Sequence, residues 1–247
     1  MLRSSFWLAS LVAGLSSCSG FAADAPSQPA TIVLVGDSTV TDTAGWGGAF
    51  AELLRPTAVC KNHAKGGAST KSFYTGNYWK NALAEKPDFV LIQFGHNDMP
   101  GKGPHRETDA ATTYRDNLKQ MLREARKIGA RPIIVTSLVR RIYLTDGSLQ
   151  KELAPYAEAA RAVAKEEQVP VVDLFARSIE LHKRMGREAT EKFGPPHKKF
   201  KGKFDGTHVA GEGAKQIAQL VADELRRVAP DLAKNLKSAD AAPVGAK

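Results

Sequence analysis

Cysteine and long hydrophobic runs are both scarce in this sequence. Its 247 residues include two cysteines, and loss or lipidation of Cys18 on export would leave Cys60 without an intramolecular disulfide partner. Cys60 ends a valine-containing run, where we expect a small buried hydrophobic residue rather than a reactive thiol. The apolar stretch at residues 6–15 is too short to cross a bilayer as a helix. The sequence therefore predicts neither a disulfide scaffold nor a membrane span in this stretch.

Several common catalytic signatures are also absent. There is no G-x-S-x-G sequence, which disfavours the nucleophile elbow of the α/β-hydrolases. There is no G-x-x-x-x-G-K-[S/T] phosphate loop and no H-E-x-x-H zinc-binding sequence. The function must therefore be sought in other patterns.

Acidic residues are fewer than basic residues in this sequence. Lys and Arg total 35 against 26 Asp and Glu, which gives a formal net charge of +9. Removal of the first segment would take away only Arg3 and leave +8. This charge favours a polyanionic partner, either nucleic acid or an acidic polysaccharide. Export would favour the polysaccharide, and a solvated basic surface without a specific partner is the alternative.

The first 22 residues have the pattern of a secretory signal peptide. Arg3 precedes the apolar stretch, small residues follow it, and no acidic residue occurs before Asp24. Two processing routes are open, because residues 20–22 suit an ordinary signal-peptidase site, whereas residues 15–18 resemble a bacterial lipobox that would leave a lipid-anchored Cys18. We predict an exported protein, periplasmic or extracellular, with a small-residue linker at 23–30.

The remaining chain alternates strands and helices five times. Apolar strands are expected at residues 31–38, 57–62, 88–94, 132–136 and 169–174. Helices are expected at residues 46–54, between 70 and 84, up to Ile128, from Glu152, at 175–185 and from near His208. This order predicts one domain over 31–234, a flavodoxin-like three-layer α/β/α sandwich around a five-stranded parallel sheet. Residues 235–247 are small and polar and are expected to form a flexible tail.

The first strand delivers a serine to the carboxyl edge of the predicted sheet. Its apolar run ends at Gly36-Asp37-Ser38, and the lack of a Cβ at Gly36 allows a sharp turn there. Ligands bind at this edge in open α/β sheets. Ser38 is therefore a candidate nucleophile, although a serine at such a turn also makes a good helix cap.

Other segments supply the partners that a serine nucleophile needs. A serine hydroxyl requires a base, and His208 is the candidate, with Asp205 three residues earlier to orient its ring. The backbone N–H groups of Ser38 and Gly67 and the side-chain amide of Asn97 could stabilise an oxyanion. Each of these residues also has an ordinary role in a turn or a cap. Their joint occurrence at strand ends favours an ester hydrolase.

Four sequence blocks resemble those of the SGNH (GDSL-type) hydrolases. In chain order they are Gly36-Asp37-Ser38, Gly67, Gly95-His96-Asn97-Asp98 and Asp205-Gly206-Thr207-His208. The resemblance spans residues 31–229. It implies Ser38 as nucleophile, Asp205 and His208 as the rest of the triad, Gly67 and Asn97 as further oxyanion donors, and no cofactor or metal.

The longer strings around these blocks resemble the rhamnogalacturonan acetylesterase branch, which removes acetyl groups from pectic backbones. They lie at residues 36–40, 45–47, 62–69, 93–98, 140–141 and 205–209. Related branches act on acetylated xylan, which is the alternative substrate. The resemblance and the charge lead us to expect substrate contacts from Trp46, His96, Arg140 and Lys203. Lys203 belongs to a basic segment, 197–204, that should flank the site and attract an acidic polysaccharide.

Two other functions stay open at this point. A metal-dependent phosphoesterase could use the carboxylates and imidazoles of Asp37, His96, Asp98, Asp205 and His208. A non-catalytic carbohydrate-binding protein could retain the same residues without turnover. The favoured prediction is a monomeric esterase whose partner is an acetylated acidic polysaccharide and not a nucleic acid.

Overall fold

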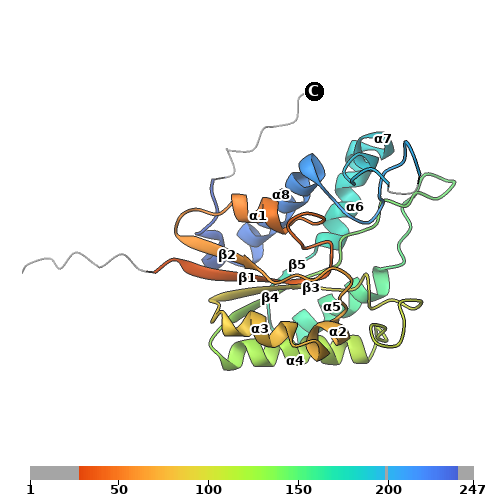
Figure 1. Ribbon diagram of the computed structural model, residues 1–247. Coiled ribbons are helices and arrows are strands. Elements are labelled where there is room, and N and C mark those ends of the chain that lie inside the picture. Colours follow the sequence, from red (N-terminus) through yellow and green to blue (C-terminus); the bar gives the residue numbers. More distant parts are fainter. Residues whose placement is uncertain (1–27, 198–199, 239–247) are drawn as a thin grey trace, which may run out of the picture.

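The computed structural model describes residues 28–197 and 200–238, and a parallel sheet forms the centre of this part of the chain (Figure 1). Five strands pair in the order β2-β1-β3-β4-β5, and every pair is parallel. Their bounds are β1 Ala30–Gly36, β2 Ala58–Asn62, β3 Phe89–Gln93, β4 Arg131–Val135 and β5 Val171–Val172. This is the flavodoxin-like order, so the predicted fold class is confirmed.

Helices cover both faces of the sheet (Figure 1). One layer contains α2 Thr70–Thr75, α3 Tyr78–Ala84, α4 Thr113–Lys127 and α5 Ala154–Glu166. The other contains α1 Gly47–Glu52, α6 Leu174–Met185, α8 Gly211–Val228 and α9 Pro230–Ala233, with the short α7 Arg187–Glu191 beside α6. No helix in the described ranges is both long and apolar enough to span a membrane.

The strand sequences explain why the sheet is covered twice. Successive side chains of a strand point to opposite faces. In β1, Ile32 and Leu34 pack in the core beneath α1 and α8, whereas Val33 and Val35 pack in the core beneath α4 and α5. All five residues of β3 are buried. A continuous apolar run is therefore what a central parallel strand with helices on both sides requires.

The structure corrects several predicted element bounds. The helix expected between 70 and 84 is two helices, because the chain turns at Asn77, which has a left-handed φ of 62°. The strand expected at 169–174 is reduced to two residues, and Asp173 instead caps α6. The helix expected from near His208 is α8, which begins at Gly211 and leaves His208 in a loop. The helix expected to run up to Ile128 ends at Lys127, and Ile128 is 47% exposed.

Cys60 lies half-buried in β2 against the core beneath α1 and α8. Burial, with a smaller contribution from Asp42, raises the pKa of its thiol to about 12. The thiol is therefore protonated at neutral pH, as expected for a residue that packs rather than reacts.

The strand order places the site. β1 lies between β2 and β3, so the chain leaves the carboxyl ends of β1 and β3 side by side. In doubly wound sheets this is the point where the direction of winding reverses and where a crevice opens. The loop after β1 carries Ser38, and the loop after β3 carries residues 95–98.

Candidate active site

Three predicted residues form one continuous line of hydrogen-bonding atoms. Ser38 lies in the turn that follows β1, and its Oγ is 2.9 Å from Nε2 of His208. The other ring nitrogen, Nδ1, is 2.9 Å from Oδ2 of Asp205. The structure thus brings together a hydroxyl, an imidazole and a carboxylate from segments 170 residues apart in the sequence.

The segment from Asp205 to His208 is a tight turn built by the Asp205 carboxylate. Its Oδ1 accepts the backbone N–H groups of Thr207 at 2.6 Å and His208 at 3.0 Å, which leaves Oδ2 for the imidazole ring. Burial alone raises the pKa of the Asp205 carboxyl. The hydrogen bonds from His208 and Thr207 outweigh burial and lower this pKa to about 2. Asp205 is therefore ionised throughout the neutral range.

Arg141 holds this turn from behind. Its Nη2 donates to the backbone carbonyls of Asp205, at 2.8 Å, and of His208, while its own N–H donates to the carbonyl of Gly206 at 2.7 Å. The side chain is almost fully buried, and burial lowers the pKa of Arg141 to about 10, so it remains charged at neutral pH. Arg141 is a positioning residue. The sequence contains the Arg140-Arg141 pair, but it does not indicate which of the two side chains points into the protein.

Arg140 faces a different neighbour. Its Nη1 lies 3.4 Å from Oε1 of Glu152, and its side chain is 17% exposed. Whether Arg140 also touches a substrate stays a prediction, and the carboxylate of Glu152 already lies beside its guanidinium.

A buried pair lies directly beneath the nucleophile turn. Asp37 is fully buried, and its Oδ2 is 3.4 Å from Nδ1 of His96. Its Oδ1 accepts the backbone N–H and the hydroxyl of Thr39 at 2.8 and 2.7 Å. Burial raises the pKa of the Asp37 carboxyl, but the neighbouring His96 and the Thr39 hydrogen bonds outweigh it, and the net pKa is lowered. This carboxylate therefore fixes the turn that presents Ser38.

The same network continues into the core. The amide of Gln93 donates to the Thr39 hydroxyl at 2.7 Å, and its oxygen accepts the indole N–H of Trp46 at 2.9 Å. Trp46 has no exposed surface, and His96 is 2% exposed. The prediction that these two rings contact substrate is wrong, because both are enclosed. Their sequence neighbours are polar or glycine, and only the three-dimensional path of the turn buries them.

The predicted oxyanion donors come from the turn after β1, which carries Ser38, and from the loops after β2 and β3, which carry Gly67 and Asn97. Among the described residues, no hydrogen bond uses the backbone N–H of Ser38 or of Gly67. The Asn97 side-chain amide donates one of its two N–H groups to the carbonyl of Ala68 at 3.0 Å, which leaves the other available. In the described part of the chain, these three donors are therefore free of other hydrogen bonds.

A tight turn over residues 65–68 presents the glycine donor. The N–H of Ala68 donates to the carbonyl of Lys65 at 3.0 Å, and Gly67 has a left-handed φ of 79°. A side chain there would be strained. A Cβ added at Gly66 would lie 4.0 Å from Cβ of Ser38, so the turn lies close beside the nucleophile.

Asp98 anchors the loops around the site. Its buried carboxylate accepts the N–H and hydroxyl of Thr70, at 3.1 and 2.5 Å, and the hydroxyl of Thr108 at 3.0 Å. Burial raises the pKa of Asp98 to about 7, although the Thr70 and Thr108 hydrogen bonds oppose the rise. Sequence reasoning offered Asp98 only as a metal ligand. The structure gives it a supporting role.

This raised pKa predicts a pH-dependent stability. The carboxyl has an ordinary pKa of 3.8, so between pH about 4 and about 7 the folded state binds a proton that the unfolded state releases. The free energy of unfolding should therefore fall as pH rises through this window, by an amount on the order of 4 kcal/mol at most. Asp98→Asn should flatten the decline, as measured by urea unfolding at pH about 4.5 and about 7.5. Parallel declines in both proteins would contradict this assignment.

The residues that a metal-dependent phosphoesterase would use as metal ligands do not lie together. Asp37 pairs with His96 beneath the turn, Asp205 pairs with His208 at the surface, and Asp98 binds the loop threonines. Within residues 28–197 and 200–238, no three His, Cys, Asp or Glu side chains are grouped so that they could hold one ion.

The basic segment before Asp205 lies partly outside the described residues, which omit 198 and 199. Lys203 is exposed, and its Nζ lies 5.6 Å from the ring centroid of Phe200. A substrate contact from Lys203 stays a prediction.

Comparisons with known proteins agree with this geometry. Residues 34–216 match the GDSL-like Lipase/Acylhydrolase family. The rhamnogalacturonan acetylesterase RhgT of Bacillus subtilis is 37% identical over 227 residues, which cover 85% of this chain and 96% of that protein. The YesY protein of the same strain is 32% identical and covers 83% of this chain and 96% of its own length.

The crystal structure of the YxiM protein of B. subtilis superposes with a TM-score of 0.69 at 25% identity. The alignment covers 81% of this chain and 57% of that one, so the chain spans little more than half of YxiM. The family match covers most of the sequence, from the second half of β1 into α8. The chain belongs to the GDSL-like lipase/acylhydrolase family, in the branch that contains these Bacillus relatives, and is a carboxylic ester hydrolase.

Proposed function

We propose that this protein is a secreted serine esterase that removes acetyl groups from a plant cell-wall polysaccharide, with rhamnogalacturonan as its substrate. The observation that carries the mechanism is the line from Ser38 through His208 to Asp205, in which both contacts are 2.9 Å. This is the arrangement in which a hydroxyl becomes a nucleophile without a metal or an organic cofactor.

The proposed reaction has two stages. Ser38 Oγ attacks the acetyl carbonyl carbon while Nε2 of His208 takes the hydroxyl proton. The tetrahedral intermediate collapses, and His208 returns the proton to the sugar oxygen, which leaves as an alcohol. Water then attacks the acetyl-serine with His208 again as base, releases acetate and restores the hydroxyl. Asp205 keeps the proton of the ring on Nδ1 and stabilises the imidazolium in both stages.

Negative charge develops on the carbonyl oxygen in both tetrahedral intermediates. The N–H groups of Ser38 and Gly67 and the free N–H of Asn97 are the donors that we assign to this oxygen. The N–H of Ala68 closes the turn that carries Gly67, and the carbonyl of Ala68 accepts the Asn97 amide. These two hydrogen bonds hold the donors in place before substrate arrives. Removal of one such donor typically costs about 10²–10³ in rate.

Two observations support an acetylated acidic polysaccharide as the substrate class. The relative RhgT, named as a rhamnogalacturonan acetylesterase, matches nearly its whole length. The chain also carries a net charge of +9, which would attract a galacturonate-containing polymer. Acetylated xylan is neutral and is the alternative substrate.

Export and lipidation belong to the same proposal. The signal-peptide pattern at residues 1–22 and the lipobox cysteine, Cys18, lie outside the described residues and are supported by sequence alone. A polymer that does not cross the membrane would be met by an exported enzyme, which agrees with this pattern. We also propose that the mature enzyme is a monomer.

The proposal is tested by acetate release from acetylated rhamnogalacturonan, acetylated pectin and acetylated xylan. We expect the highest kcat/KM on rhamnogalacturonan and no change when EDTA is added. Loss of activity with EDTA would support the phosphoesterase alternative. Salt-sensitive binding to pectin without acetate release would support the non-catalytic carbohydrate-binding protein.

A further inference from the structure

A hollow of about 270 Å³ adjoins the proposed oxyanion site. It is lined by Lys65, Gly66, Gly67, Ala68, Ser72, Tyr78, His105 and Arg106. The glycine turn forms its wall toward the nucleophile, since a Cβ at Gly66 would lie 4.0 Å from Cβ of Ser38. The volume is just below the range of about 300–1,000 Å³ usual for ligand pockets, which suits a single sugar residue. The sugar next to an acetyl group bound at Ser38 would therefore lie here.

One guanidinium is held at the edge of this hollow. Nε of Arg106 donates to the carbonyl of Lys102 at 2.9 Å, which fixes the plane of the group. Its Nη1 points toward the glycine turn, 3.8 Å from where a Cβ of Gly67 would lie. Within the described ranges, Arg106 forms no ion pair with a carboxylate. Arg106 therefore lines the hollow with a guanidinium that no carboxylate of the described residues pairs.

The loop that carries this guanidinium is braced on both sides. The N–H of Arg106 donates to the carbonyl of Gly103 at 2.9 Å, and Nζ of Lys71 donates to the carbonyl of Pro104 at 2.6 Å. The N–H of Thr108 donates to the carbonyl of Asp98 at 2.9 Å. A group held in this way loses little freedom when it binds a ligand.

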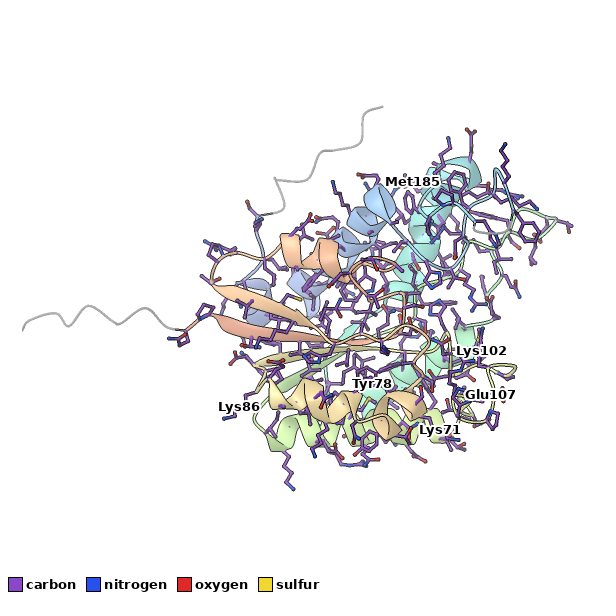
Figure 2. The ribbon with its side chains drawn as sticks, viewed as in Figure 1. Lys71, Tyr78, Lys86, Lys102, Glu107 and Met185 are labelled. Carbon is purple, nitrogen blue, oxygen red and sulfur yellow. The ribbon has the colours of Figure 1, made fainter. Side chains whose placement is uncertain are left out.

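Positive charge accumulates around the hollow. Nζ of Lys65 lies 5.7 Å from the ring centroid of Tyr78, which lines the floor. Burial lowers the pKa of Lys102, and the nearby cations Arg140 and Arg106 lower it further. Figure 2 shows Lys71, Lys102 and Glu107 at the end of the molecule toward which the strands run, far from Lys86.

The acidic groups of this region are already engaged. Glu152 lies beside Arg140, and Oε1 of Glu107 accepts the N–H of Gly103 at 2.5 Å. Among the described residues, neither Lys65 nor Arg106 forms an ion pair with a carboxylate, and such a pair of cations favours an anionic ligand.

We propose that this hollow is a subsite for a uronic acid residue beside the acetyl group bound at Ser38, with Arg106 binding its carboxylate. A guanidinium and a carboxylate match as two parallel hydrogen bonds, and lysine offers no such fork. The ring of Tyr78 supplies an apolar surface for the sugar. The inference rests on the proposed esterase function and makes Arg106, rather than Lys203 or Arg140, the residue that distinguishes acidic from neutral polymers.

The test is a comparison of Arg106→Gln with the wild-type enzyme. Acetate release is measured with acetylated rhamnogalacturonan oligosaccharides, the same oligosaccharides after reduction of their carboxyl groups, and p-nitrophenyl acetate. For each enzyme, kcat/KM on the acidic oligosaccharide is divided by kcat/KM on p-nitrophenyl acetate. We expect this ratio to be about 10- to 100-fold lower in Arg106→Gln than in the wild type, the loss expected for a hydrogen bond to a charged group. The change should appear mainly in KM. Reduction of the substrate carboxyl groups should remove most of this difference.

Arg123→Gln is the matched control. Arg123 is exposed on α4 and carries the same charge, so this variant separates a specific contact from a general loss of net charge. It should behave as the wild type on every substrate. Arg106→Lys should recover only part of the loss, because it restores charge without the fork. An equal loss in Arg106→Gln and Arg123→Gln, or an unchanged substrate ratio in Arg106→Gln, would overturn the subsite.

A binding measurement keeps this inference separate from the esterase proposal. The Ser38→Ala protein is titrated with an unacetylated oligogalacturonate by calorimetry, alone and combined with Arg106→Gln. We expect the second substitution to raise Kd at least about 10-fold. This result would support the subsite even if the wild type released no acetate, which would contradict the proposed function alone. An unchanged Kd would overturn the subsite.

Discussion

Replacement of Ser38 by alanine is expected to lower kcat for acetyl-ester hydrolysis by about 10⁵- to 10⁶-fold, the loss typical of a serine nucleophile. The reason is geometric, since Ser38 Oγ is the atom 2.9 Å from Nε2 of His208. The fold should persist, because the turn is held by the Asp37 and Thr39 contacts and not by the hydroxyl. Initial rates on p-nitrophenyl acetate give the measurement.

Ser148→Ala provides the control for this substitution. Ser148 is an exposed serine in a distant turn, where its hydroxyl donates to Asp146 at 2.7 Å. This variant should keep wild-type rates. A Ser38→Ala protein that retained even a tenth of the activity would contradict the nucleophile assignment.

Asp205→Asn is expected to reduce kcat by about 10⁴-fold, as a change of tautomer does in other triads. The amide that replaces the carboxylate would donate to Nδ1 of His208, so that Nε2 would carry the proton. Nε2 could then no longer accept the proton of Ser38. The loss should appear in kcat with little change in KM, because Asp205 acts through the ring and does not touch substrate.

The matched control for this variant is Asp146→Asn. Asp146 accepts the backbone N–H of the residue two positions later at 2.8 Å, as Asp205 does at 2.6 Å, and it also accepts the hydroxyl of Ser148 instead of the imidazole that Asp205 contacts. It should therefore reproduce any general effect of altering such a turn without the loss of rate. Equal losses from both substitutions would show that Asp205 matters only for folding the turn.

The framework of the fold follows from local sequence patterns. An apolar run of five residues buried on both sides has few alternatives to a central parallel strand, which is why β1 and β3 were predicted near their observed bounds. The ends of these strands then located Ser38 and Asn97 at one edge. The Asp205–His208 pair was predictable for a similar reason, because three residues are the span of one turn.

Side-chain direction within loops was not predictable in the same way. Trp46 and His96 lie among glycines and polar residues, yet Trp46 is enclosed through its bond to Gln93 and His96 through its contact with Asp37. The choice between Arg140 and Arg141 depended on which side chain turned toward the 205–208 loop. Such contacts join segments far apart in the sequence, and the helix and strand periodicities of the sequence do not predict them.

The role proposed for Arg106 was likewise not predictable from the sequence. Arg106 follows a glycine-rich segment whose course depends on the buried Asp98 and on Lys71. Sequence reasoning placed a substrate-binding charge on Lys203 because its basic segment, 197–204, directly precedes Asp205. The structure instead brings Arg106 to the wall beside Gly67.

The central claim is that Ser38 itself forms the covalent intermediate, and covalent labelling tests it most directly. Phenylmethylsulfonyl fluoride is added in increments, residual esterase activity is measured, and the modified peptide is identified by mass spectrometry. Our account predicts a single modified residue, Ser38, with the labelled fraction equal to the fraction of activity lost. Complete modification of Ser38 with activity intact, or complete inactivation with Ser38 unmodified, would contradict it.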